Sequence, residues 1–231
     1  MNTDRLITRR TVMSATCVAT VAAMMSPAPT AEAKTDLGRP RVMWQQCVER
    51  ALQCFPTGGG YHTGRNIPPG FRQTAWTGLD RAVRVTATGV CVDPYLATPS
   101  FCSSATYLLL LKSLELYEKT CGVMPPRKEW EYLKPYTVDH RPYPIQNDGV
   151  GAWGRANANG PGMAELAHEL KIGTNLYIGT TGEYANLADR NEMFASIRRY
   201  DFMKIFWNDE IGKDERGHMV VVLGRSSHSN R

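Results

Sequence analysis

The chain has 231 residues and a formal net charge of +5, and its basic side chains are not gathered into dense runs. Proteins that bind nucleic acid usually carry such runs, so we expect no nucleic-acid partner. A small net positive charge is compatible with binding to an anionic polymer such as a cell wall. By itself it does not identify the partner.

The first 33 residues have the pattern of an export signal. Three arginines precede an uncharged apolar stretch over 11–25, which is too short to span a bilayer comfortably. The segment closes with Ala31-Glu32-Ala33, the small-x-small pattern that a signal peptidase requires. We expect cleavage before Lys34, no stable membrane insertion, and a periplasmic or secreted mature protein.

The export route is open to two interpretations. The pair Arg9-Arg10 resembles a twin-arginine signal, which would mean export of a folded protein, but an ordinary Sec signal can also carry two adjacent arginines. Removing 33 residues leaves 198, which is enough for one domain with a proper core. We therefore expect a single domain over 34–231.

The mature chain keeps five cysteines, an odd number, in a compartment that oxidises thiols. The economical interpretation is two disulfides and one free thiol, although sequence alone does not fix the pairing. We favour Cys47 with Cys54, which are close in sequence, and Cys91 with Cys121, which would bracket a free Cys102. The alternative is that all five stay reduced.

The first half of the mature chain predicts two helices separated by irregular chain and a strand. Residues 41–54 have helical spacing, 61–78 are rich in Gly, Pro and aromatics, and 82–92 alternate as a strand does. An apolar run over 107–116 then predicts a helix that Ser100 or Ser103 caps and that ends at Gly122.

The second half predicts a loop-rich insertion and a C-terminal hairpin. Residues 123–160 combine prolines and glycines with tyrosines and charges, which favours an extended loop. Helical patterns follow at 163–171 and 187–197. The alternation over 201–223 predicts a β-hairpin whose second strand begins at His218.

Cys102 and His218 are the candidate catalytic pair. Cys102 is expected at a helix N-terminus, where the helix dipole and unpaired backbone N–H groups favour the thiolate. A cysteine hydrolase needs an imidazole that assists thiolate formation and later protonates the leaving amine. The alternatives are a structural half-cystine or buried thiol at Cys102 and a satisfied strand histidine at His218.

The order of three short motifs resembles the NlpC-like, papain-related cell-wall peptidases and amidases. The matching stretches are residues 95–103 around Cys102, residues 200–207, and residues 217–223 beginning Gly-His. The resemblance covers residues 93–224 and implies an α+β, papain-like domain whose nucleophile helix packs on an antiparallel β-sheet. It also implies hydrolysis of an amide bond in peptidoglycan or a related peptide without a cofactor, and it places Tyr95 on the oxyanion side.

The chain departs from the pattern of that family in three places. Phe101 precedes the nucleophile where the family usually has Asp, and Tyr200 replaces a usual Gly. The sequence also ends thirteen residues after His218, where the family continues through strands that hold a residue orienting the histidine. His228 and Asn230 are the remaining polar candidates for that role.

Other polar residues point to structure rather than chemistry. Asp201 is expected to be structural, and His62, His140 and His168 have no partner at metal-ligand spacing, so no metal site is expected. Two other functions stay open. One is a catalytically inactive wall-binding or inhibitor-like protein on the same scaffold, and the other is an acyl transferase that uses the same Cys and His.

Overall fold

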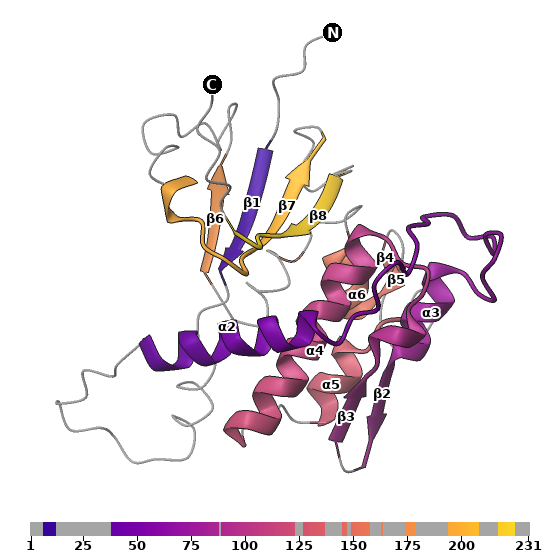
Figure 1. The fold of residues 1–231 in the computed structure, drawn as a ribbon, viewed down its shortest axis with the longest axis horizontal. Coiled ribbons are helices and arrows are strands. Elements are labelled where there is room, and N and C mark those ends of the chain that lie inside the picture. The colour runs from indigo at the N-terminus through magenta and orange to yellow at the C-terminus, as the bar shows by residue number, and fades with distance from the viewer. Residues whose placement is uncertain are drawn as a thin grey trace, which may run out of the picture.

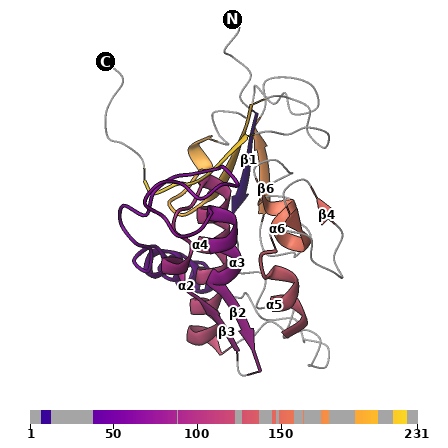
Figure 2. The ribbon, with the colours of Figure 1, turned by 90° about the vertical axis from the view of Figure 1, so that its right-hand side faces the viewer.

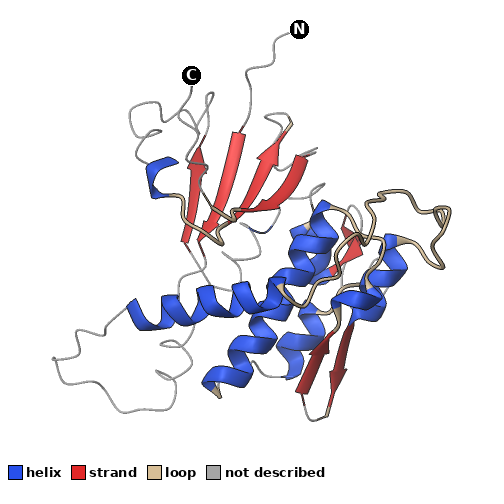
Figure 3. Cartoon of the chain, in the orientation of Figure 1, coloured by secondary structure: helices blue, strands red, loops and turns tan. Residues whose placement is uncertain are grey.

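The chain is described by a computed structural model, which mixes helices with small antiparallel sheets in an α+β architecture (Figures 1 and 3). In the side view, the largest sheet lies in the upper part of the molecule and most of the helices lie below it (Figure 2). The structure describes residues 7–12, 38–87, 89–122, 127–136, 145–146, 149–157, 163, 174–178, 194–207 and 217–224.

The largest sheet has four strands in the order β6-β1-β7-β8, all antiparallel. Its members are β6 (Thr174–Ile178), β1 (Ile7–Val12), β7 (Phe202–Phe206) and β8 (Gly217–Val221). β7 alternates buried and half-buried side chains, as a strand with one face on the core does. The predicted hairpin is confirmed, with Ile205 opposite His218.

The strand β1 falls inside the segment that the sequence predicts to be an export signal. It pairs with β6 along Thr8–Val12 and with β7 along Ile7–Thr11. A chain that begins at Lys34 lacks this strand, so its β6 and β7 would have no strand between them. Cleavage before Lys34 stays a prediction.

Two long helices, α2 (Gly38–Leu52) and α4 (Cys102–Cys121), pack on each other and confirm two predicted helices. The rings of Trp44 and Tyr117 meet edge to face across this contact, with centroids 6.2 Å apart. α4 also packs against β8. Within the described part of the chain, no helix is both long and apolar enough to cross a membrane.

The ends of α4 differ partly from the prediction. Gly122 ends the helix in the left-handed conformation at φ 66°, and its N–H donates to the Glu118 carbonyl at 2.8 Å, as expected. Neither Ser100 nor Ser103 caps the start, however. The Ser104 hydroxyl accepts from the Phe101 N–H at 2.8 Å, so a serine inside the first turn satisfies the residue before Cys102.

The region from 61 to 92 holds one more helix than predicted. α3 (Ala75–Ala82) begins within the stretch assigned to a loop, and the Thr74 hydroxyl caps it by accepting from the Thr77 N–H at 3.1 Å. The predicted strand is a hairpin of β2 (Val83–Thr86) and β3 (Gly89–Val92). A short 3-10 turn, η1 (Pro94–Leu96), then leads toward α4.

The predicted loop-rich insertion over 123–160 contains regular structure, so that prediction is wrong for its described part. α5 (Arg127–Leu133) and α6 (Gly151–Ala156) flank a small pair of strands, β4 (Ile145–Gln146) and β5 (Gly149–Val150). Each helix buries a tryptophan in the core, Trp130 and Trp153, and that burial outweighs the loop-like composition. Most of the helices predicted at 163–171 and 187–197 lies outside the described residues.

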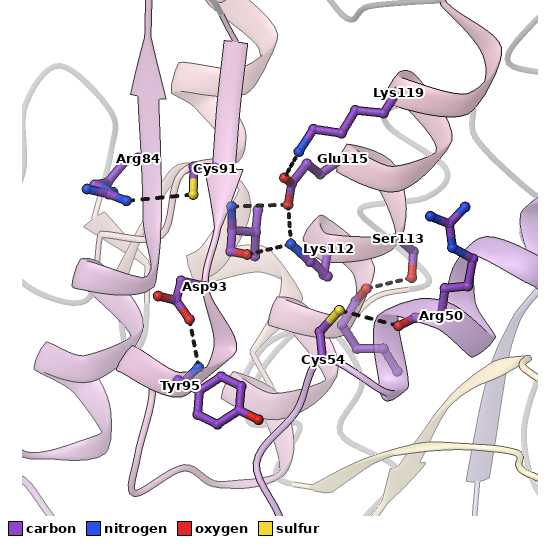
Figure 4. Close-up of polar contacts among 12 residues, drawn as sticks. Arg50, Cys54, Arg84, Cys91, Asp93, Tyr95, Lys112, Ser113, Glu115 and Lys119 are labelled. Carbon is purple, nitrogen blue, oxygen red and sulfur yellow. Dashed lines mark hydrogen bonds and ion pairs between the residues drawn. The ribbon is translucent and has the colours of Figure 1, made fainter.

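A buried carboxylate joins α4 to β3 (Figure 4). Glu115 is 2% exposed and accepts from the Val92 N–H at 3.2 Å, from the Lys112 ammonium at 2.8 Å, and from the Lys119 ammonium. Lys112 also donates to the Val92 carbonyl at 2.8 Å. Glu115 and Lys112 therefore pair with each other and also form hydrogen bonds with the backbone N–H and carbonyl of Val92 in β3.

The five cysteines in the described part of the chain are all thiols in the structure. The Cys47–Cys54 pairing is not formed: Cys47 is a buried thiol within α2, and Cys54 is a thiol in the turn that follows Leu52. The Cys91–Cys121 pairing is not formed either. Cys91 lies beside Arg84, whose guanidinium is 3.7 Å from its sulfur, and Cys121 neighbours Cys47 where α2 meets α4.

Candidate functional site

The two predicted catalytic residues line one cavity, although they are more than a hundred positions apart in the sequence. Its volume of about 410 Å³ is within the usual range for small-molecule sites. The residues around it come from the 61–76 segment, the start of α4, the end of α6 and the β7–β8 hairpin: Tyr61, Thr63, Arg65, Trp76, Phe101, Cys102, Ser103, Asn157, Trp207, Gly217 and His218.

Cys102 is the first residue of α4, as predicted, and an aromatic cluster fixes the residue before it. Phe101 is 4% exposed, with its ring 4.7 Å from that of Trp76 and 6.2 Å from that of Trp153. The burial of this apolar ring anchors the turn that precedes Cys102.

His218 is the second residue of β8 and is half-buried. Its place opposite Ile205 is set by the β7–β8 pairing, and α4 packs on β8, which brings the helix start and the strand start together. The ring of Trp207 stacks on the imidazole, with centroids 6.4 Å apart and planes at 28°. A strand and a stacked ring therefore restrain the position of the imidazole.

Tyr61 is a site residue that the sequence did not reveal. Its hydroxyl lies close enough to Cys102 to interact with both the thiol and the backbone N–H of that residue. Burial of the hydroxyl and the neighbouring thiol raise the pKa of Tyr61 above its ordinary value, so the group stays protonated at neutral pH. A neutral hydroxyl beside the thiol and the first N–H of α4 can donate to an oxygen that develops negative charge there.

Backbone pairing holds Tyr61 against the turn that precedes Cys102. Tyr61 forms a parallel bridge with Ser100, whose carbonyl accepts from the His62 N–H at 2.9 Å and whose N–H donates to the Gly60 carbonyl at 3.0 Å. Gly60 has φ +80°, and a Cβ there would lie 2.5 Å from the Phe71 ring. Glycine is therefore required for the turn that presents Tyr61.

Tyr95, which the resemblance places on the oxyanion side, does not line this cavity. It lies in η1, where the Asp93 carboxylate accepts from the Tyr95 N–H at 3.1 Å (Figure 4). This turn leaves the Tyr95 side chain 63% exposed. Among the described residues, Tyr61 lies next to the thiol, and the oxyanion role expected of Tyr95 stays a prediction.

The third polar partner of the pair was sought at His228 or Asn230, and both lie outside the described residues. Among the residues that line the cavity, Asn157 has a side-chain amide and is 2% exposed, and the sequence did not single it out. Asp201 accepts from the Arg198 N–H at 2.7 Å, which is consistent with the structural role expected for it.

A second cavity, of about 390 Å³, shares Tyr61 with the first. Its other walls are mainly glycine, proline and apolar side chains, including Pro56, Pro94 and Leu108, and they include no thiol or imidazole. In the described parts of the chain, no group of three or more His, Cys, Asp or Glu side chains is placed to hold a metal ion. Among the residues that line the two cavities, the one thiol is that of Cys102 and the one imidazole is that of His218.

Comparisons with protein family models, curated proteins and solved structures found no match for this chain. Its class is defined by its own features: an α+β domain in which a cysteine at a helix N-terminus and a histidine on a neighbouring strand line one cavity.

Proposed function

We propose that the protein is an exported cysteine hydrolase of papain-like type that cleaves an amide bond in peptidoglycan or a related peptide. The observation that carries the proposal is that Cys102 and His218 line the same cavity. The Tyr61 hydroxyl at the thiol supplies a third group that this chemistry needs.

The residues support a two-step acyl transfer to water. The Cys102 thiolate attacks the amide carbonyl carbon, and the resulting oxyanion accepts hydrogen bonds from the Tyr61 hydroxyl and the Cys102 N–H. The His218 imidazolium gives its proton to the leaving amine as the C–N bond breaks. Neutral His218 then takes a proton from a water molecule, which attacks the thioester, and the carboxylic acid and the thiolate are released.

Two other functions are separated from hydrolysis by the products. An acyl transferase with the same pair would transfer the acyl group to an added amine and release little free carboxylate. A binding or inhibitor-like protein would release neither product. Incubation with purified peptidoglycan fragments, with amines and carboxylates quantified by mass spectrometry, distinguishes the three.

Brief treatment of the native protein with iodoacetamide is expected to modify Cys102 first and to remove hydrolysis in proportion. Cys102 is half-buried at an open cavity, whereas Cys47 is 2% exposed and burial raises the pKa of its thiol. A raised pKa leaves less thiolate, so Cys47 should react slowly at neutral pH and faster as the pH rises. Peptide mapping at timed intervals, beside the fragment assay, measures both quantities.

Two outcomes of the alkylation experiment would contradict this prediction. Full hydrolysis by protein in which Cys102 is completely modified would exclude this thiol as the nucleophile. Modification of Cys47 before Cys102 would contradict the accessibility argument.

Tyr61→Phe is expected to lower kcat by about 100-fold with little change in KM, because the hydroxyl acts on charge that develops only in the transition state. Tyr95→Phe is the informative comparison, since it removes a hydroxyl from the position that the sequence pattern favoured. The larger loss should fall on Tyr61→Phe. If Tyr95→Phe is the more damaging, the oxyanion assignment returns to Tyr95.

A further inference from the structure

The second cavity, of about 390 Å³, has a wall without permanently charged side chains among the described residues that line it. The wall consists of the glycine-rich chain after α2, the η1 turn with the residues that follow it, and the first two turns of α4. Its one ionisable side chain is Tyr61, which is neutral at neutral pH because burial raises its pKa. The lining residues are Phe55, Pro56, Gly58, Gly59, Gly60, Tyr61, Pro94, Ala97, Thr98, Ser100, Ala105 and Leu108.

Polar groups of this wall form hydrogen bonds within the protein. The Ser100 N–H donates to the Gly60 carbonyl at 3.0 Å, and the Thr98 hydroxyl donates to the Tyr95 carbonyl at 3.3 Å. A charged group that entered the cavity would lose its hydration without meeting an opposite charge in the wall, which is unfavourable. An apolar group gains free energy when it leaves water. The cavity therefore favours an uncharged, apolar occupant.

The second cavity is a close neighbour of the first. Tyr61 lines both, and its hydroxyl lies close enough to Cys102 to interact with the thiol. The start of α4 also contributes to both, with Cys102 on the wall of the first and Ala105 on the wall of the second. Because each residue of an extended peptide spans about 3.3–3.6 Å, a substrate whose carbonyl carbon lies at the thiol reaches the second cavity within about two or three residues.

We propose that the second cavity is a subsite that binds an apolar side chain of the substrate, within about two or three residues of the amide bond that is cleaved. This inference rests on the proposed hydrolase function and narrows its substrate class to peptides with an apolar side chain at that distance. Ala105 and Leu108 form the α4 side of the subsite. They determine specificity and take no part in bond breaking.

The substrate test uses matched short peptides that carry Leu, Asn or Asp at one position, moved in turn over the three positions on each side of the scissile bond. These three side chains have nearly the same shape and differ in polarity and charge. At the position that reaches the second cavity, the wild type is expected to prefer Leu over Asn by about tenfold in kcat/KM and to accept Asp least.

Ala105→Leu tests whether this preference arises in the second cavity. Ala105 is half-buried on the cavity wall, so a larger side chain there takes up space that the substrate would use. The preference for Leu over Asn should fall to about twofold or less. Leucine is a good helix former, so the fold should be retained, which thermal denaturation checks.

Ala87→Leu is the matched control, because it makes the same substitution away from both cavities. Ala87 is exposed at the turn between β2 and β3, and it lines neither cavity. This variant should keep the wild-type preference.

A second readout does not depend on hydrolysis. The Leu, Asn and Asp peptides are titrated into Cys102→Ala, which has no nucleophile, and binding is measured by calorimetry at several temperatures. The Leu peptide is expected to bind about tenfold more tightly than the Asn peptide, with a more negative heat-capacity change, because apolar surface is buried. Adding Ala105→Leu to this variant should remove both differences.

The two readouts separate failure of the subsite from failure of the proposed function. Tighter binding of the Leu peptide that Ala105→Leu abolishes, without any hydrolysis by the wild type, would support the subsite and refute the hydrolase. Hydrolysis with no preference for Leu at any tested position would overturn the subsite and leave the hydrolase standing. A preference that Ala105→Leu leaves unchanged would also overturn it, since the apolar side chain would then bind elsewhere.

Discussion

Cys102→Ala and His218→Ala are each expected to lower hydrolysis of peptidoglycan fragments by at least about 1000-fold, and the double variant should be little worse than either. The nucleophile and its base act as a unit, since the thiolate cannot attack without forming and the amine cannot leave without a proton. Rates are measured by release of amine under saturating and subsaturating substrate.

Matched controls separate chemistry from folding. Cys54→Ala removes a half-buried thiol that donates to the Arg50 carbonyl outside the cavity, and it should keep full activity. A loss of about tenfold to 1000-fold in His228→Ala would support it as the residue that orients His218, and an unchanged rate would exclude it from that role. If folded Cys102→Ala and His218→Ala variants keep full activity, the hydrolase proposal fails.

Glu115→Ala is expected to lower the free energy of unfolding by about 3 kcal/mol, because it leaves the Lys112 ammonium and the Val92 N–H without a carboxylate partner in a largely buried place. For a protein of this size the loss corresponds to a fall in Tm of about 6–12 °C. Thermal and urea denaturation measure the effect.

Lys119→Ala is the matched control on the same carboxylate. Lys119 is 62% exposed, so water already screens its charge and its removal should cost less than about 1 kcal/mol. Equal losses for the two variants would contradict the view that the contact between α4 and β3 depends on the buried carboxylate.

The parts of the site that were predictable from sequence lie on elements with strong local signals. The apolar run of α4 and the alternation of the β7–β8 hairpin indicated a helix start at Cys102 and a strand start at His218. Their approach to one cavity follows from the packing of α4 on β8, a contact that no local pattern encodes. The resemblance to a family supplied that expectation.

The cavity wall over 60–76 was not predictable, because long-range contacts determine its shape. Tyr61 reaches Cys102 through backbone pairing with Ser100. No sequence pattern around Tyr61 or Ser100 predicts this pairing. α3 was hidden by Gly78, which looks like a loop residue. A Cβ there would lie 3.0 Å from the Leu96 carbonyl oxygen, so the glycine is needed for close packing within a helix.

Tyr200 has φ 71°, a left-handed conformation that costs a residue with a Cβ about 1–2 kcal/mol and glycine almost nothing. Its ring is 6% exposed and lies 4.6 Å from the Arg199 guanidinium carbon, contacts that offset this cost. The family that the sequence resembles usually has glycine at this position, and glycine adopts this dihedral angle without strain. A sequence motif that requires glycine at this position would miss this chain. A structural motif that requires a positive φ at this position would find it.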